Sequence, residues 1–243
     1  KRKIVVFESD DWGMIRMASQ EAFNRLLKKK YPVDSCIYSS NDALETNSDV
    51  LFLAEVLQNY KDSNGNFAKF TLNNVVANPN FTKIKENGFK KYEYESFTET
   101  LKRYSNTENV MNYYKEGIGA GLFQLQFHGR EHVNVNRWID KLVDNDRAII
   151  DAFEEEMYTV TVGPNTSGRR DGLDSFGMAF KKQYESMESI VGTGTELFEK
   201  IWGYKSLSFI APCYTWLENL EPILNNNAIK YIQGSHAQII PVD

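Results

Sequence analysis

The sequence predicts an α/β protein of one domain, with a parallel sheet that is either wound open or closed into a barrel, and a barrel-like (β/α)7-type arrangement is favoured. Short apolar segments rich in β-branched residues alternate with amphipathic segments of helical period along most of the chain. Such alternation is typical of a parallel sheet whose strands are joined by crossover helices. Seven strands are expected, and a chain of 243 residues without repeats or a Pro-rich linker suits a single barrel.

The expected elements follow one another in chain order. A first strand at Ile4–Glu8 precedes a helix at Ser19–Lys29 that Ser19 is placed to cap, and the helix Ser48–Tyr60 has an apolar face. Further strands are expected at Lys69–Val76, Tyr92–Glu95, Leu122–Phe127, Tyr158–Val162, Leu207–Ile210 and Ile229–Ile232. Further helices are expected at Glu108–Lys115, Val135–Val143, Asp146–Glu156, Thr195–Trp202 and Trp216–Asn225.

Two later helices also have start signals, and one region departs from the regular alternation. Asn134 can cap the helix at Val135–Val143, and Thr193 and Glu196 have capping-box spacing. The domain is expected to span residues 1–243, with an elaborated region around 61–121 that is rich in Asn, Tyr and Lys. A chain of this size buries about 70% of its unfolded surface, so a metal site in it is expected to be functional rather than structural.

Composition excludes several classes of partner. The formal net charge is -5 and the charges are interspersed, so neither nucleic acid nor an anionic membrane surface is expected as a partner. No apolar run approaches the ~18 residues of a transmembrane helix, and two cysteines do not make a disulfide framework. The chain opens on the first strand without a leader, so its location is left open. Export is expected if a leader has been removed, and a cytoplasmic location is expected otherwise. The oligomeric state is left open.

Two of the three histidines lie four residues apart, His128 and His132. If this segment is helical, both rings lie on one face, which is a common way to present two nitrogen ligands to one metal ion. His128 follows the strand Leu122–Phe127 directly, at the end where barrel enzymes carry their catalytic groups.

A pair of aspartates, Asp10 and Asp11, follows the first expected strand, also at its carboxyl end. Adjacent carboxylates after a buried strand are costly unless a positive charge compensates them. One of them is expected to bind metal while its neighbour acts as a general base on a metal-bound water. Asp11, His128 and His132 then form a ligand set that leaves metal positions open for water and substrate. The set suits zinc, and also cobalt, nickel, manganese or iron(II).

The aspartate pair, followed by the later H-x-x-x-H, resembles the polysaccharide deacetylases of the carbohydrate esterase group. The resemblance implies a distorted seven-stranded β/α barrel and hydrolytic removal of acetyl groups from a carbohydrate. It implies Asp10 as the catalytic base and Asp11, His128 and His132 as ligands of a divalent metal, with zinc expected.

The segment Ser208–Trp216 is similar to the third motif of that family, where an Arg-x-Pro-Tyr stretch orients the base and contacts the oxyanion. The arginine is absent here, and Cys213 separates the proline from Tyr214. The resemblance implies an oxyanion contact from the backbone N–H of Tyr214 and a general acid role for His236.

Three arginines could supply the missing charge: Arg130, Arg169 and Arg170. The last two lie in a Gly-rich loop, 163–172, that could also grip an anionic group of a substrate.

Other functions stay open at this point. A glycoside hydrolase needs two carboxylates that flank the scissile bond, and Glu8, Asp10 and Glu131 are the available candidates. A barrel that binds glycans without hydrolysing them would also fit the missing arginine. A mononuclear iron oxygenase shares the ligand set, but the alternation of strands and helices argues against its usual antiparallel fold.

Overall fold

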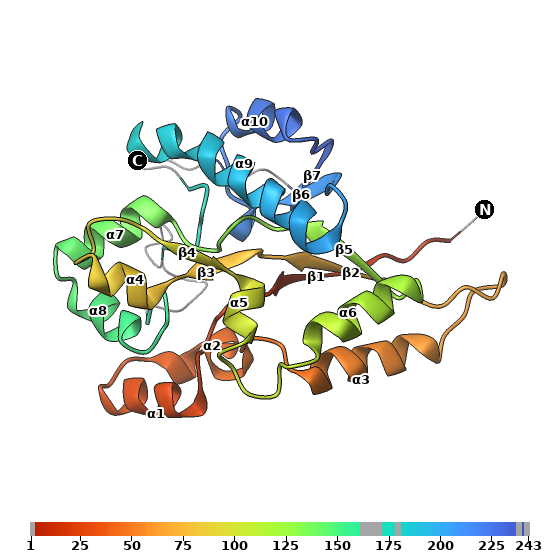
Figure 1. Cartoon of the computed structure of the whole chain (residues 1–243), viewed down its shortest axis with the longest axis horizontal. Helices are drawn as coiled ribbons and strands as arrows, with labels where there is room; N and C mark the ends of the chain where they lie inside the picture. The colour runs from red at the N-terminus through yellow and green to blue at the C-terminus, as the bar shows by residue number, and fades with distance from the viewer. Residues whose placement is uncertain (1–2, 161–171, 178–180, 237–239, 241–243) are drawn as a thin grey trace.

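The computed structural model describes residues 3–160, 172–177, 181–236 and 240, and a parallel sheet lies at its centre (Figure 1). The sheet has five strands in the order β1-β2-β5-β6-β7. They are β1 (Phe7–Trp12), β2 (Phe70–Asn74), β5 (Phe123–Phe127), β6 (Ser208–Ile210) and β7 (Tyr231–Gln233). Two further strands, β3 (Ala77–Pro79) and β4 (Tyr94–Ser96), form a separate antiparallel ribbon. The α/β class and the parallel arrangement are confirmed.

The sheet is curled and has five strands, which is consistent with the expected distorted barrel, and it does not form a closed one. The expected third strand, Tyr92–Glu95, pairs with β3 and not with the main sheet. The expected strand Tyr158–Val162 has no strand conformation over residues 158–160, and residues 161 and 162 lie outside the described part. A hydrogen bond from Gln233 Nε2 to Glu8 Oε2 spans the gap between the two edge strands.

The first strand begins later than predicted. Ile4, Val5 and Val6 are 66–75% exposed and lie before β1, although their sequence is typical of a buried strand. Asp10 and Asp11 therefore lie inside β1 and not in a loop after it. The pairing of β1 with β2 is interrupted between Ser9 and Trp12, which places the aspartate pair in a bulge.

Helices surround the sheet, and two of them begin directly after the expected cap residues. The oxygen of Ser19 accepts from the N–H of Ala22, and Asn134 accepts from that of Arg137. The described helices are α1 (Gln20–Lys28), α2 (Ile37–Asn41), α3 (Asn47–Gln58), α4 (Phe81–Glu86), α5 (Phe97–Leu101), α6 (Val110–Gly119), α7 (Val135–Val143), α8 (Arg147–Phe153), α9 (Lys181–Trp202) and α10 (Leu220–Asn226). Two 3-10 turns, η1 (Val33–Ser35) and η2 (Pro212–Tyr214), complete the list.

The predicted helix start at Thr193 is wrong, because α9 runs through this position without a break. Its hydroxyl donates to the carbonyl of Ser189, one turn earlier in the same helix. None of the helices in the described part of the chain combines the length and the apolar character that crossing a lipid bilayer requires.

The main apolar core lies between the strands and the helices α3, α6 and α9. In Figure 1, α9 lies above the strands, and α3 and α6 lie below them. Strand β5 turns Phe123, Leu125 and Phe127 to this core, while the glutamines between them face the other side. Helix α6 comes so close to β5 that a Cβ atom at Gly117 would lie 2.2 Å from the Phe123 ring. A second core gathers around Trp138, between α4, α7 and α8.

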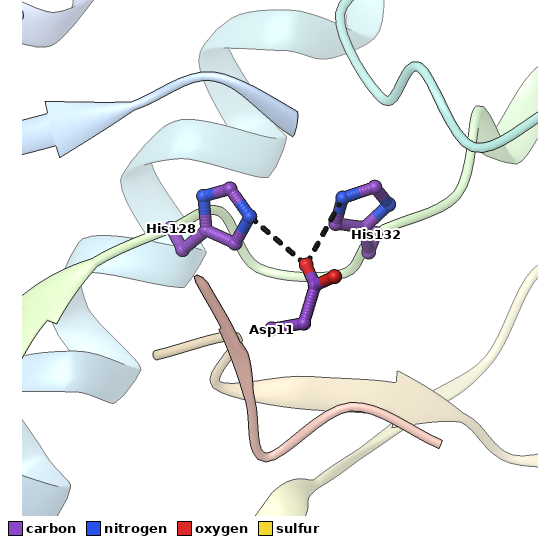
Figure 2. Close-up of side chains that lie close together, drawn as sticks. All are labelled: Asp11, His128 and His132. Atoms are coloured by element: carbon purple, nitrogen blue, oxygen red, sulfur yellow. Dashed lines mark hydrogen bonds and ion pairs between the residues drawn. The ribbon is translucent and has the colours of Figure 1, made fainter. Parts of the chain in front are cut away.

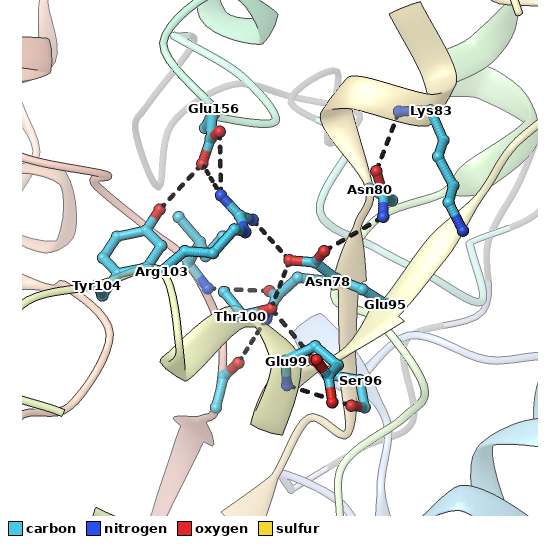
Figure 3. Close-up of polar contacts among 12 residues, drawn as sticks. Asn78, Asn80, Lys83, Glu95, Ser96, Glu99, Thr100, Arg103, Tyr104 and Glu156 are labelled. Atoms are coloured by element: carbon cyan, nitrogen blue, oxygen red, sulfur yellow. Dashed lines mark hydrogen bonds and ion pairs between the residues drawn. The ribbon is translucent and has the colours of Figure 1, made fainter. Parts of the chain in front are cut away.

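The region 61–121 contains β2, a central strand of the sheet, together with the β3–β4 ribbon, α4, α5 and α6. Its description as an elaborated region stays a prediction. A polar network ties the ribbon to its surroundings (Figure 3). Asn78 contacts Thr100, which donates to Glu95, and Arg103 bridges Glu95 to Glu156.

Candidate metal centre

Asp11, His128 and His132 come together at the carboxyl edge of the sheet (Figure 2). The Nε2 atoms of His128 and His132 lie 3.1 and 3.3 Å from the same carboxylate oxygen, Asp11 Oδ1. Ligand atoms held 2.0–2.1 Å from a tetrahedral ion are separated by roughly 3.3 Å, and these two separations are close to that value. The three predicted ligands therefore form a group that could hold a metal ion.

The carboxylate of Asp11 owes its direction to the bulge in β1. Asp11 has a φ of 69°, in the left-handed region that residues other than glycine rarely adopt. Such a bulge changes the direction of a side chain at a strand end. Here the side chain reaches the two histidines, which are 117 and 121 residues away along the sequence.

The two histidines lie in an irregular loop, so they come together without the helical conformation that would place both rings on one face. The loop follows β5 and ends at the start of α7, and Gly129 within it has a φ of 105°. Backbone N–H groups of Val76 and Ala77 donate to the carbonyls of Gly129 and Arg130 and hold the loop against the β3 segment. The ring centroids are 5.3 Å apart.

A backbone carbonyl fixes the ring of His128. Its Nδ1 lies 2.8 Å from the carbonyl oxygen of Ile210, which requires a proton on Nδ1 and leaves the Nε2 lone pair for a ligand bond. The Nδ1 atom of His132 is buried and has no hydrogen-bond partner within the described residues.

Burial and charge shift the pKa values of the triad in different directions. Burial acts to raise the pKa of Asp11, but the two histidines and Arg16 hold it well below its usual range. Burial lowers the pKa of His132 to about 4, so this ring is neutral at pH 7. Burial also acts to lower the pKa of His128, but the hydrogen bond and charge of Asp11 raise it overall. Asp11 is therefore ionised and His132 is deprotonated, as metal ligation requires.

Three buried side chains hold the turn that follows Asp11. Glu45 accepts from the N–H of Gly13 at 3.0 Å, Asn78 donates to the carbonyl of Gly13 at 2.8 Å, and Asn74 donates to the carbonyl of Trp12 at 2.9 Å. Sequence reasoning missed all three. The available signal was the amide pair Asn73 and Asn74 at the end of a buried strand, because buried polar groups need partners.

Asp10 lies beside the triad and is held by two neutral donors. Asn73 Nδ2 donates to Asp10 Oδ1 at 2.8 Å, and the Tyr214 hydroxyl donates to Asp10 Oδ2 at 3.3 Å. Asn73 is fully buried on β2, and Tyr214 lies in η2, directly after β6.

The predicted oxyanion contact from the backbone of Tyr214 does not agree with the structure. Its N–H already donates to the carbonyl of Ala211 at 2.7 Å, in a turn where Cys213 and Tyr214 both have positive φ. Tyr214 reaches the site through its hydroxyl instead.

Arg130 does not supply the missing arginine charge. Its guanidinium donates to Glu131 and to Thr193, and it lies 4.3 Å from the centre of the Tyr94 ring. Arg169 and Arg170 lie outside the described residues. Another cation, Arg16, is close enough to act on the charges of Asp11 and His132.

His236 is not brought to the triad. It is exposed in the segment after β7 and does not belong to the described residues that line the cleft around the metal centre. Its role as general acid stays a prediction that the geometry does not support.

A cleft of about 970 Å³ opens above the triad. Asp10 and Tyr214 line it beside the metal ligands, and α2 with the following loop forms another part of its wall. The remaining lining residues are Ser9, Trp12, Met14, Arg16, Cys36, Tyr38, Asn41, Asp42, Ala43, Leu44, Glu45, Thr46, Asp49, Leu173 and Cys213. Both cysteines are free thiols.

Comparison with known proteins gives one loose structural likeness. No protein-family model and no curated protein matches the sequence. Among solved structures, IcaB from Ammonifex degensii is similar at 12% identity with a TM-score of 0.32, over 98% of this chain and 89% of that one. The superposition is loose, and the chemistry of this chain follows from its own residues.

Proposed function

We propose that this protein is a metal-dependent hydrolase that removes acetyl groups from an N- or O-acetylated carbohydrate. One observation carries the proposal: Asp11, His128 and His132 converge at the carboxyl edge of the sheet, and a second carboxylate, Asp10, faces the same cleft. The curled sheet, whose edges approach at Glu8 and Gln233, supports a relation to the distorted (β/α)7 barrels of the polysaccharide deacetylases.

Different residues of the chain carry out different parts of the proposed reaction. Asp11, His128 and His132 would hold the divalent ion, with zinc expected, which polarises an acyl carbonyl and activates water when bound. Asp10 takes the proton of the attacking water, and Asn73 and Tyr214 keep its carboxylate in place. The leaving amine or alcohol then receives a proton from Asp10 or from solvent, because the structure brings no histidine other than the two ligands to the cleft lining that it describes.

One of the three carboxylates considered for a glycoside hydrolase, that of Glu131, is buried and paired. Glu131 is 1% exposed and ion-paired with Arg130, and it does not line the cleft as far as the structure describes it. A buried, paired carboxylate of this kind is unsuited to flank a glycosidic bond.

The test combines metal content with turnover of an acetylated substrate. The wild type is expected to carry about one divalent ion per chain by elemental mass spectrometry, and His128→Ala is expected to lose it together with activity. Asp10→Asn should keep the ion but lose at least about 100-fold in turnover, the scale of a lost general base. A chelator should abolish wild-type activity.

His236→Ala is the matched control, because this histidine is exposed and away from the cleft lining described above. It should keep both metal and turnover. Wild-type protein that binds no ion after soaking contradicts the metal centre, whereas bound ion without any hydrolysis would leave a barrel that only binds glycans.

A further inference from the structure

The cleft extends from the metal centre along α2, and this wall carries an exposed aromatic ring. Tyr38 lies in α2 and is 56% exposed, although it lines the cleft. Tyr214, which is 36% exposed, lines the same cleft from η2. The two rings therefore belong to different walls of one cleft, with the Asp10 carboxylate beside Tyr214.

Next to Tyr38 are a cation and an anion with unused hydrogen-bonding capacity. The guanidinium carbon of Arg16 lies 5.8 Å from the centre of the Tyr38 ring. Within the described residues, the side chains of Arg16 and Asp42 make neither a hydrogen bond nor an ion pair. Both side chains are half-buried.

Asp42 lies within electrostatic range of both Arg16 and the metal ligand. Burial raises the pKa of Asp42, with Arg16 acting to lower it and Asp11 to raise it further. Partly buried polar groups without partners carry a desolvation cost unless a ligand satisfies them. These two groups therefore point to a ligand rich in hydroxyl or amide groups.

We propose that Tyr38, Arg16 and Asp42 form a subsite for a neutral sugar residue that neighbours the acetylated unit. The exposed ring offers a flat apolar surface for the C–H face of a pyranose. Arg16 supplies donors and Asp42 supplies acceptors for the hydroxyl groups at its rim. The opposite charges of Arg16 and Asp42 offset each other, so this wall suits a neutral sugar better than an acidic one.

The subsite rests on the proposed function, and its test separates the two. Zinc-loaded protein is assayed with 4-nitrophenyl acetate, which has no sugar, and with acetylated glucosamine and xylose oligomers of one to four units. The wild type is expected to show a kcat/KM that rises at least about tenfold from one unit to the longer oligomers. Tyr38→Ala should reduce that rise about tenfold, the scale of one lost aromatic contact, and Arg16→Met and Asp42→Asn should reduce it as well.

Tyr60→Ala is the matched control, because Tyr60 is a tyrosine of similar exposure, 65%, that does not line the described cleft. A length dependence that is the same in Tyr38→Ala and wild type would overturn the subsite while leaving the hydrolase intact. If the wild type hydrolyses none of these compounds, the proposed function fails, and calorimetric titration with the same oligomers decides the subsite. Binding that Tyr38→Ala weakens supports it, and no binding to either oligomer overturns it.

Discussion

Two neutral donors at Asp10 take the place that the family resemblance gives to an arginine. The Asn73 amide and the Tyr214 hydroxyl each bind one carboxylate oxygen, at 2.8 and 3.3 Å. A neighbouring cation would stabilise the ionised carboxylate strongly and so weaken it as a base, whereas neutral donors orient it at a smaller cost in basicity. The missing arginine is therefore compatible with a working base at this position.

Removing the buried donor is expected to impair turnover without affecting the metal. Asn73→Ala leaves Asp10 Oδ1 without its 2.8 Å partner. A hydrogen bond to a charged group contributes about 1.5–3 kcal/mol, so kcat should fall roughly 10- to 100-fold. Metal content stays at the wild-type level, because Asn73 makes no hydrogen bond to any of the three ligands in the described structure. Steady-state kinetics and elemental analysis on the same samples check this.

Tyr214→Phe is the graded comparison for this prediction. Its contact with Asp10 is longer, 3.3 Å, and more exposed, so the loss in kcat should be smaller than in Asn73→Ala. Equal kcat values for Asn73→Ala and wild type would show that Asp10 is not oriented by this amide.

At the scale of elements, the candidate metal centre depends on one bulged strand and the side chains that hold its end. β1 supplies Asp10 and Asp11, and the turn at Gly13 is fixed by Glu45 and Asn78. Gly13 has a φ of 85°, and a Cβ atom there would lie 2.5 Å from the carbonyl oxygen of Val75. This position requires glycine both for conformation and for space.

Gly13→Ala is expected to destabilise the fold and to weaken metal binding. The left-handed conformation costs a non-glycine residue about 1–2 kcal/mol, and the contact with the Val75 backbone adds to that cost. The shift needed to relieve the contact moves the turn two residues from Asp11, so the affinity for zinc should fall. Chemical denaturation and metal titration measure the two effects.

Gly65→Ala separates conformation from crowding. Gly65 has the same φ of 85°, but nothing lies within 4 Å of the Cβ position. This variant should lose only the conformational part of the free energy of unfolding and should bind metal normally. A Gly13→Ala variant no less stable than Gly65→Ala would argue against the tight turn.

The sequence predicted which residues form the candidate site, but it did not predict the backbone structure that positions them. A spacing of four residues indicated two cooperating histidines, whose rings would share one face if the segment were helical. In the structure His128 and His132 meet in a loop that is held by backbone bonds from Val76 and Ala77. Those bonds join segments about 50 residues apart, and no local pattern encodes them. The same holds for Asn73 and Glu45, whose roles depend on which strands and loops become neighbours.

Local signals predicted two helix starts correctly, although the capping-box spacing of Thr193 and Glu196 lies inside α9. The caps of Ser19 and Asn134 and the bounds Val135–Val143 were predicted from neighbouring residues alone. The apolar run Ile4–Val6 misled for the opposite reason, because its burial depends on a packing partner that it does not find among the described residues.

At the scale of the whole molecule, the two faces of the sheet explain why it stays open. Buried apolar side chains of β2 and β5 pack against the helices, while the opposite face carries Thr71, Asn73, Gln124 and Gln126. A closed barrel of this size fills its interior with packed side chains, usually branched apolar ones. A polar inner face gives little hydrophobic free energy for such closure.

A buried carboxylate outside the candidate metal centre, that of Asp151, links α8 to the segment at the end of α1. Asp151 of α8 is 5% exposed and accepts from Lys29 at 2.8 Å, from Tyr31 at 2.7 Å and from Arg147 at 3.1 Å. Two of these partners come from the segment at the end of α1, about 120 residues earlier. Burial acts to raise the pKa of Asp151, but these three partners lower it overall.

This arrangement predicts how stability depends on pH. A carboxyl whose pKa is lower in the folded than in the unfolded chain stabilises the fold above its unfolded pKa, about 3.9, and loses that contribution as the pH falls toward the folded value. Asp151→Asn should therefore lower the free energy of unfolding by about 1–3 kcal/mol at pH 7, and the difference from wild type should shrink below about pH 4.

Glu154→Gln is the control, because Glu154 pairs with Lys85 while both side chains are exposed, at 45% and 60%. Exposed pairs contribute little, so its stability should follow the wild type throughout. Urea unfolding of the three proteins between pH 3 and 7 gives the comparison. If the free energies of unfolding of Asp151→Asn and wild type differ by a constant amount over this range, the carboxylate charge of Asp151 does not stabilise the link between α8 and the end of α1. Only the packing of the Asp151 side chain would then contribute.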